Sequence, residues 1–311
     1  MDFYMRTAFL FSGQGAQYPG MMKDLYDAEP SAKEVFDLAD SALSREISKI
    51  CFEGTQEELN LTHNTQPCML AGDLAAAMVL KAHGIEPAAV AGFSLGEYAA
   101  LAYAGAISTR DVFRVIQIRA DAMQEAVAPG EGAMAAFIGA TAEQVEELCA
   151  RVTKGYVTAA NYNSPVQTVV SGSTAGVDEA CELAEAAGLR CVKLAVSAPF
   201  HCALMEPAAR RLEEEFESMV FRTPTIPVYM NVDGRPLIDG SAASLLVKQA
   251  MSPVHWVQTL ENMQADGIDT FIECGAGKTL SGLVKKTLKG VKILRVENLK
   301  TLQSTLEELQ A

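Results

Sequence analysis

Apolar and polar residues follow one another along the chain in blocks that predict buried strands succeeded by helices. A short apolar run at Thr7–Phe11 ends in a glycine-rich turn, and a second run ends at Gly92, where an alanine-rich segment that favours helix begins without an intervening loop. Buried strands that alternate with helices are typical of an α/β protein. Further helices are predicted at 30–61 and 70–80, and further strands at 221–231 and 270–273.

Residues 131–196 have a rhythm of their own, in the order strand, helix, strand, strand, helix, strand. This is the order of a ferredoxin-like module. The six segments are 133–139, 141–152, 156–162, 167–171, 174–187 and 189–196. A chain of 311 residues can bury a large and a smaller core. We therefore expect a large domain formed by residues 1–130 and 197–311, with a small ferredoxin-like domain, residues 131–196, inserted into it.

The turn from the second strand into its helix carries Gly92-x-Ser94-x-Gly96. A serine on so sharp a turn has a strained backbone, and the flanking glycines prevent clashes across it. Its hydroxyl would stand exposed beside the Leu95 N–H and the positive end of the helix. A serine that only caps the helix is the alternative. The strand before and the helix after favour Ser94 as a nucleophile.

The first glycine-rich turn, Ser12–Gly15, follows the first predicted strand. In serine hydrolases the loop after an early strand supplies a backbone donor to the oxyanion. The Gln14 N–H is therefore a candidate oxyanion donor, and tight packing of the backbone is the alternative.

The chain contains four histidines, so the choice of a base for Ser94 is narrow. His63 and His83 precede the nucleophile in segments typical of turns or surface, and His255 could equally pack against a neighbouring tryptophan. His201 stands at a strand end before a helix, where a side chain can project into a cleft. His201 is therefore the candidate general base.

Arg119 interrupts the apolar stripe of a helix that begins with a capping-box pattern at Ser108. A guanidinium directed toward the core is costly unless it meets an anion. Two anions fit: a carboxylate elsewhere in the chain, or a carboxylate on a substrate, which the arginine fork can hold with two hydrogen bonds.

Charge and cysteine content narrow the class of protein. The formal net charge is −14, which argues against non-specific nucleic-acid binding. The seven cysteines are odd in number and form no CxxC pair, so we expect reduced thiols and no zinc site. The first residues lack an apolar run long enough for a signal peptide or a membrane span, so a cytoplasmic protein is expected.

Gly277-Lys278-Thr279 resembles the end of a phosphate-binding loop, but the glycine required five positions earlier is Ile272. A nucleoside triphosphatase is therefore excluded. Lysines nevertheless gather in and after this turn, at Lys278, Lys285, Lys286 and Lys289. They form either a solvated helix face or a landing site for phosphates or an acidic protein.

Taken together, the motifs resemble those of the malonyl-CoA:acyl carrier protein transacylases of fatty acid synthesis and the related acyltransferase domains of polyketide synthases. The match follows the family in order and spacing over nearly the whole chain. The matching segments are Phe11–Gly15, Thr65–Pro67, Gly92–Tyr98, Gln117–Arg119, Gly132–Ala136, Asn161–Pro165, Pro199–His201, Asn231–Asp233, Pro253–Trp256 and Gly275–Lys278.

The resemblance implies a large domain similar to α/β-hydrolases with an inserted ferredoxin-like domain. It also implies transfer of a malonyl group from malonyl-CoA to the phosphopantetheine thiol of acyl carrier protein, through an ester on the serine. No cofactor is expected because the CoA thioester is a substrate, and a monomer without nucleic-acid or membrane partners is expected. The implied site is Ser94 as nucleophile, His201 as base oriented by backbone carbonyls, Gln14 and Leu95 as oxyanion donors, Arg119 as partner of the malonyl carboxylate, and Asn163 and Gln249 as further positions.

Three residues bear on acyl selection. Phe93 stands where the family usually has histidine, and Ser12 where proline is common. Phe200, before His201, resembles the malonyl-preferring pattern and would disfavour a methyl branch by about 1–3 kcal/mol. The alternatives to the fatty acid enzyme are a trans-acting polyketide synthase acyltransferase, a serine thioesterase or esterase, and a carrier-protein docking module with a degenerate site.

Overall fold

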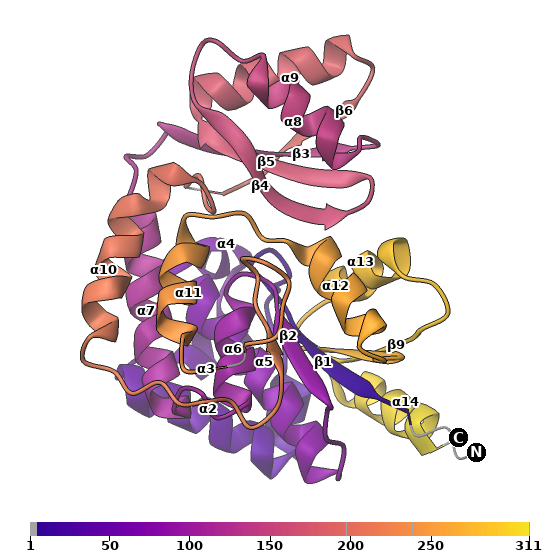
Figure 1. Cartoon of the computed structure of the whole chain (residues 1–311). Coiled ribbons are helices and arrows are strands. Elements are labelled where there is room, and N and C mark those ends of the chain that lie inside the picture. The colour runs from indigo at the N-terminus through magenta and orange to yellow at the C-terminus, as the bar shows by residue number, and fades with distance from the viewer. Residues whose placement is uncertain (1–4, 197, 238, 311) are drawn as a thin grey trace.

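The computed structural model describes residues 5–196, 198–237 and 239–310. It contains two separate sheets, one parallel and one antiparallel, and Figure 1 shows the antiparallel sheet with its helices above the larger helical body that surrounds the parallel sheet. The predicted α/β class is confirmed. No described helix has both the length and the apolar composition needed to cross a bilayer.

The parallel sheet has the strand order β7-β2-β1-β8-β9. Its side chains alternate between two hydrophobic clusters: Phe9 and Phe11 belong to one, and Ala8 and Leu10 to the other. A sheet covered on both faces needs such continuously apolar strands. The strands are β1 (Thr7–Phe11), β2 (Ala89–Gly92), β7 (Val228–Tyr229), β8 (Thr270–Cys274) and β9 (Lys292–Val296).

The carboxyl ends of the three central strands coincide. Phe11 is in register with Gly92 on one side and with Cys274 on the other. The turns that follow β1, β2 and β8 therefore meet at one edge of the sheet, which is where open α/β sheets bind ligands.

Helices cover the sheet and its edges. Those of the large body are α1 (Lys23–Ala28), α2 (Pro30–Leu43), α3 (Ile47–Glu53), α4 (Gln56–Asn60), α5 (Thr62–Ala82), α6 (Gly96–Tyr103), α7 (Thr109–Glu125), α10 (Glu206–Phe216), α11 (Ala242–Ala250), α12 (Trp256–Ala265), α13 (Thr279–Thr287) and α14 (Leu299–Gln310), with a short 3₁₀ turn at Ala203–Met205.

Several predicted boundaries are wrong. The helical stretch predicted at 30–61 is three helices, because Ser44 adopts a left-handed conformation (φ 50°) after α2 and Gly54 ends α3 in extended backbone. The strand predicted at 221–231 shrinks to the two residues of β7. The helix predicted at 70–80 begins already at Thr62 and contains Pro67.

The antiparallel sheet confirms the predicted order of elements: β3 (Gly132–Ile138), α8 (Ala142–Ala150), β4 (Val157–Ser164), β5 (Gln167–Ser173), α9 (Thr174–Ala186) and β6 (Arg190–Lys193). The strand order β4-β5-β3-β6 is ferredoxin-like, and α8 and α9 lie on the face away from the parallel sheet (Figure 1). Main-chain hydrogen bonds from Tyr162 N–H to the Val254 carbonyl (2.9 Å) and from Val254 N–H to the Ala160 carbonyl (2.8 Å) tie β4 to the large body. The predicted domain limits stay a prediction, and Ser197, at the second limit, lies outside the described residues.

The expectation of seven reduced cysteines is wrong for one pair. Cys181 of α9 and Cys191 of β6 form a disulfide, with their Cα atoms 5.7 Å apart. The pair is brought together by the packing of α9 on the antiparallel sheet, which the spacing of the cysteines does not reveal. The other cysteines, Cys51, Cys68, Cys149, Cys202 and Cys274, are free thiols.

The turn between β2 and α6 depends on a close backbone approach at Gly96. A Cβ atom at Gly96 would lie 2.3 Å from the Phe11 carbonyl oxygen, whereas one at Gly282, within α13, would meet nothing within 4 Å. Because the blocking atom belongs to backbone, Gly96→Ala should lower the free energy of unfolding by about 1–3 kcal/mol or more. Gly282→Ala, the matched control, should leave it unchanged or raise it by up to about 1 kcal/mol. Urea denaturation of both variants measures this, and equal stabilities would contradict the packing argument.

Candidate active site

Ser94 occupies the sharp turn between β2 and α6 in a left-handed conformation, with φ 55°. Such backbone conformations are rare for residues other than glycine and concentrate at functional sites. The Asn231 side chain fixes the turn: its Oδ1 accepts the Ser94 N–H (2.7 Å) and its Nδ2 donates to the Gly92 carbonyl (2.7 Å). Asn231 thus binds the main chain of Ser94, and the serine side chain points into the cavity.

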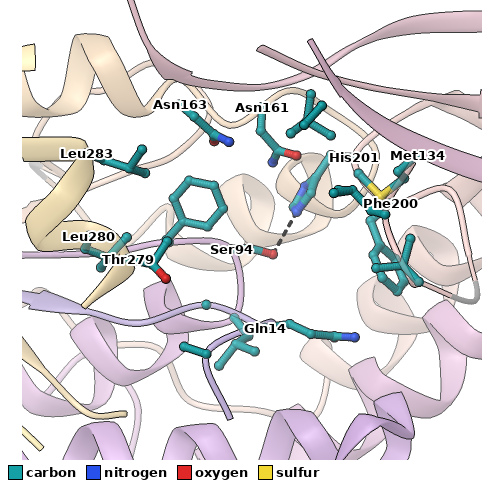
Figure 2. A pocket seen from close by; sticks show the side chains of 18 of the residues that line it. Gln14, Ser94, Met134, Asn161, Asn163, Phe200, His201, Thr279, Leu280 and Leu283 are labelled. Atoms are coloured by element: carbon teal, nitrogen blue, oxygen red, sulfur yellow. Dashed lines mark hydrogen bonds between the residues drawn. The ribbon is translucent and has the colours of Figure 1, made fainter. Parts of the chain in front are cut away.

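His201 is the histidine that reaches the serine. Its Nε2 lies 2.7 Å from Ser94 Oγ (Figure 2), and its Nδ1 lies 2.9 Å from the main-chain carbonyl oxygen of Gln249. A carbonyl only accepts, so Nδ1 carries the proton and the Nε2 lone pair faces the hydroxyl. Burial, with the Arg119 charge adding to it, lowers the pKa of His201 to about 4. The imidazole is therefore neutral near pH 7 and able to accept a proton.

The other histidines are engaged elsewhere. His63 Nδ1 lies 2.5 Å from an Asp121 carboxylate oxygen, and His83 Nε2 lies 3.2 Å from one of Glu29. His255 stacks on Tyr162, with ring centroids 5.1 Å apart, rather than on the tryptophan that follows it. None of them contacts Ser94.

Arg119 is almost fully buried and points at the serine. Its guanidinium donates to Ser94 Oγ (3.1 Å), to Gln66 Oε1 (2.7 Å) and to Gln249 Oε1 (3.2 Å). It forms no ion pair with any residue that the structure describes, and its Nε has no hydrogen-bond partner there. Of the two anions that the sequence allowed, the intramolecular carboxylate is not found. A buried cation beside a reactive hydroxyl is suited to hold an anionic group of a substrate.

Glu97, in the first turn of α6, is a buried acid that the sequence analysis passed over. Its Oε2 accepts a hydrogen bond from Gln249 Nε2 (2.7 Å), and its Oε1 accepts the Asn231 N–H (3.3 Å). Burial raises the pKa of Glu97 to about 8. The carboxyl group therefore carries less negative charge near neutral pH than an exposed glutamate does, and it forms no ion pair with Arg119. Its position three residues after the candidate nucleophile was the available signal.

A cavity of about 470 Å³ opens over Ser94. Its walls come from the ends of β1 and β2, from β4 and β5 of the antiparallel sheet, and from α13; Figure 2 shows Asn161 and Asn163 on one side of Ser94 and Gln14 on the other. Of the site residues predicted from sequence, the lining includes Gln14, Phe93, Ser94, Leu95, Arg119, Asn163, Phe200 and His201. Gln249 lies behind this wall, where it holds His201 and Arg119.

The residues of both predicted oxyanion donors line the cavity over Ser94. The N–H groups of Gln14 and Leu95 form no hydrogen bond to other described residues, so both are available to a ligand. The Ser12 hydroxyl donates to the Ala276 carbonyl (3.4 Å), which ties the turn after β1 to the turn after β8. Ser12 can make this contact where proline would have no donor.

Two phenylalanines and an amide shape the remaining wall. Phe93 packs edge-on against Trp256, with ring centroids 5.3 Å apart at 69°, and Phe200 lies near Met134 (Figure 2). Asn163 Oδ1 is buried without a hydrogen-bond partner among the described residues. The cavity therefore combines apolar walls with a few polar groups that await a ligand. The described residues contain no cluster of three side chains able to ligate a metal.

Comparison with known proteins agrees with this geometry. The acyl transferase domain family matches residues 8–305. A curated relative, the malonyl CoA-acyl carrier protein transacylase of Bacillus subtilis, is 42% identical over 309 residues, which cover 98% of each chain. The crystal structure of malonyl CoA-acyl carrier protein transacylase from Clostridium perfringens is similar with a TM-score of 0.95 and 41% identity, over 98% of this chain and 97% of that one.

A further similar structure is the malonyl-transacylase of a type II polyketide synthase, solved in complex with its acyl carrier protein. It has a TM-score of 0.94 and 37% identity, over 97% of this chain and 99% of that one. The family match spans nearly the whole chain and contains every residue of the site and both sheets, apart from Thr7 at the start of β1. The chain belongs to the acyl transferase domain family.

Proposed function

We propose that the protein transfers the malonyl group of malonyl-CoA to the phosphopantetheine thiol of acyl carrier protein and so supplies extender units for fatty acid synthesis. The observation that carries the proposal is the buried guanidinium of Arg119, 3.1 Å from Ser94 Oγ and without an ion-pair partner among the described residues. Malonyl-CoA brings a reactive thioester and a free carboxylate separated by one methylene group, which match the hydroxyl and the cation. The relatives named above support the same substrates.

The first half-reaction forms an ester on Ser94. His201 Nε2 takes the hydroxyl proton while Oγ attacks the thioester carbonyl, and the oxygen that becomes negative accepts hydrogen bonds from the Gln14 and Leu95 N–H groups. The C–S bond then breaks, and the imidazolium returns the proton to the departing CoA sulfur. Malonyl-Ser94 remains.

The second half-reaction reverses these roles. The carrier-protein thiol gives its proton to His201 and attacks the ester carbonyl, and the same two N–H groups stabilise the second oxyanion. Ser94 leaves as an alkoxide and recovers its proton from His201. The phosphopantetheine thiol of the carrier protein thereby receives the acyl group, and the enzyme returns to its starting state.

The walls of the cavity select the acyl group and the thiol arm. Arg119 holds the malonyl carboxylate with its two terminal nitrogens, Phe200 and Phe93 leave little room for a branch, and the Asn163 amide offers a polar partner to the pantetheine arm. We expect the enzyme to act in the cytoplasm as a monomer without a bound cofactor, because the CoA thioester itself supplies the activated acyl group.

A carrier protein of polyketide synthesis is the second candidate acceptor. The malonyl-transacylase that was solved with such a carrier protein resembles this chain over nearly its full length. The two candidates share every catalytic step and differ only in the protein that carries the accepting thiol.

Ser94→Ala should abolish the acyl-enzyme. Intact-protein mass spectrometry after incubation with malonyl-CoA should show a malonyl adduct on the unaltered protein and none on the variant, because alanine has no nucleophilic oxygen. Methylmalonyl- and acetyl-CoA, run in parallel, report acyl selection. An adduct on the Ser94→Ala protein would refute the assignment of the nucleophile.

Arg119→Ala should impair malonyl transfer far more than acetyl transfer. Loss of hydrogen bonds between a charged donor and a charged acceptor should lower kcat/KM for malonyl-CoA by about 100-fold, whereas acetyl-CoA has no carboxylate to lose. Arg114→Ala, on the exposed face of the same helix, is the matched control and should change neither. Equal losses with the two donors would remove the carboxylate-binding role.

The pH profile of the first half-reaction should follow the lowered pKa of His201, about 4. Protonation of His201 removes the base, so kcat/KM for malonyl-CoA should stay level as pH falls through about 6.5, the ordinary histidine value, and decline only toward pH 4. Stopped-flow acylation measures the profile, with circular dichroism at each pH to verify folding. An inflection near pH 6.5 would show that His201 titrates as an exposed histidine.

A further inference from the structure

A second cavity of about 540 Å³ lies on the other side of α13, between that helix, β9 and the start of α14. Four of its lining side chains are cationic: Lys278, Lys285, Arg295 and Lys300. The Ser304 hydroxyl stands among them, whereas the hydroxyl of Ser281, also in the lining, donates to the Glu273 carboxylate (2.6 Å). No acidic residue lines the cavity. This cluster of positive charge contrasts with the net charge of the whole chain, which is −14.

The lysines of this cavity are free to meet a ligand. Arg295 is paired with Glu297. The ammonium groups of Lys278, Lys285 and Lys300 form neither an ion pair nor a hydrogen bond with any residue in the described part of the chain. Their mutual repulsion is relieved when an anion enters.

The second cavity adjoins the cavity over Ser94. Lys278 and Gly282 line both, and Lys286 lines the first alone. The helix α13 is therefore a ridge between the two, with a glycine at the point where they meet. A side chain at Gly282 would meet nothing within 4 Å, so a flexible chain can cross the ridge there.

We propose that this second cavity binds the phosphorylated nucleotide end of the acyl-CoA donor. The inference rests on the proposed function. With the acyl group at Ser94, the pantetheine arm would run past Asn163 and cross α13 at Gly282. The diphosphate and ribose phosphate of the nucleotide would then meet the lysines and hydroxyls beyond. Ammonium and hydroxyl donors in a hollow suit compact phosphate groups, whereas an acidic protein surface would have to reach in between two helices.

This site would distinguish the acyl-CoA donor from the carrier-protein acceptor. The carrier protein attaches its arm through a single phosphate and has no nucleotide, so it gains nothing from the second cavity. Lys285→Glu and Lys300→Glu should each raise KM for malonyl-CoA about tenfold, with kcat little changed, since each loses a charge-assisted contact to phosphate. KM for malonyl-pantetheine, which lacks the nucleotide, and KM for carrier protein should stay the same.

Lys289→Glu is the matched control, because Lys289 follows α13 but lines neither cavity. It should leave every KM unchanged apart from a small general effect that disappears in high salt. A rise in KM for carrier protein with KM for malonyl-CoA unchanged would overturn the proposal and assign the cavity to an acidic protein surface. Unchanged values for all substrates would also overturn it.

Calorimetric titration with adenosine 3′,5′-bisphosphate tests the site without any acyl transfer. The unaltered protein should bind the probe, and Lys285→Glu and Lys300→Glu should weaken binding about tenfold. Absence of binding would overturn the inference even if malonyl transfer is observed. Binding with no acyl transfer would instead contradict the proposed function. Weakened binding in the variants with unchanged KM for malonyl-CoA would mean a separate nucleotide site and would overturn the assignment to the donor.

Discussion

The hydrogen bonds of Gln249 connect every charged and reactive group of the site. Its main-chain carbonyl accepts from His201, while its side-chain amide donates to the Ser94 carbonyl and to Glu97 and accepts from Arg119. Gln249 stands in the last turn of α11, where carbonyls lack the partners they have in a helix interior, and its carbonyl also accepts the Ser252 N–H (3.4 Å). The negative end of the helix dipole also favours a transient imidazolium. A helix terminus therefore does for His201 what an aspartate does in many serine enzymes, without adding a full negative charge near Arg119.

The strained serine turn is sustained by packing from both directions. Gly96 lets α6 begin against the end of β1, and Asn231, which follows β7, clamps the same turn from the other side. Both contacts depend on the coincidence of strand ends at one edge of the parallel sheet. The antiparallel sheet then closes the site from above, because β4 is bonded to the main chain at Val254. Both sheets are therefore needed to enclose the cavity over Ser94.

Local sequence patterns were sufficient to identify site residues that are unusual at their positions in a strand, helix or turn. A serine between glycines after a strand, an arginine in an apolar stripe and a histidine at a strand end all stood out, and the structure brings Ser94, Arg119 and His201 into contact. Asn231 and Glu97 lie in segments that match the family, but no local pattern indicated what they do, because their partners are more than 130 residues away. The Cys181–Cys191 pair and the two-residue β7 were missed for the same reason, since packing and not local propensity determines them. The ends of α2, α3 and α4 depend on the backbone conformation of single residues. Ser44, for example, ends α2 in a left-handed conformation that a serine does not predict.

The unneutralised charge of Arg119 has a consequence for the energy of the fold. Arg119 is held by neutral side-chain oxygens and lies over the Tyr98 ring, 5.3 Å from its centroid, and such a buried guanidinium is less favourable than one that also faces a carboxylate. On the proposed mechanism, a malonyl group on Ser94 would bring its carboxylate to this buried charge, so the acyl-enzyme should be more stable against unfolding than the free enzyme. The contact that selects the acyl group would then also stabilise the fold. An acyl group without a carboxylate would leave the Arg119 charge without a partner.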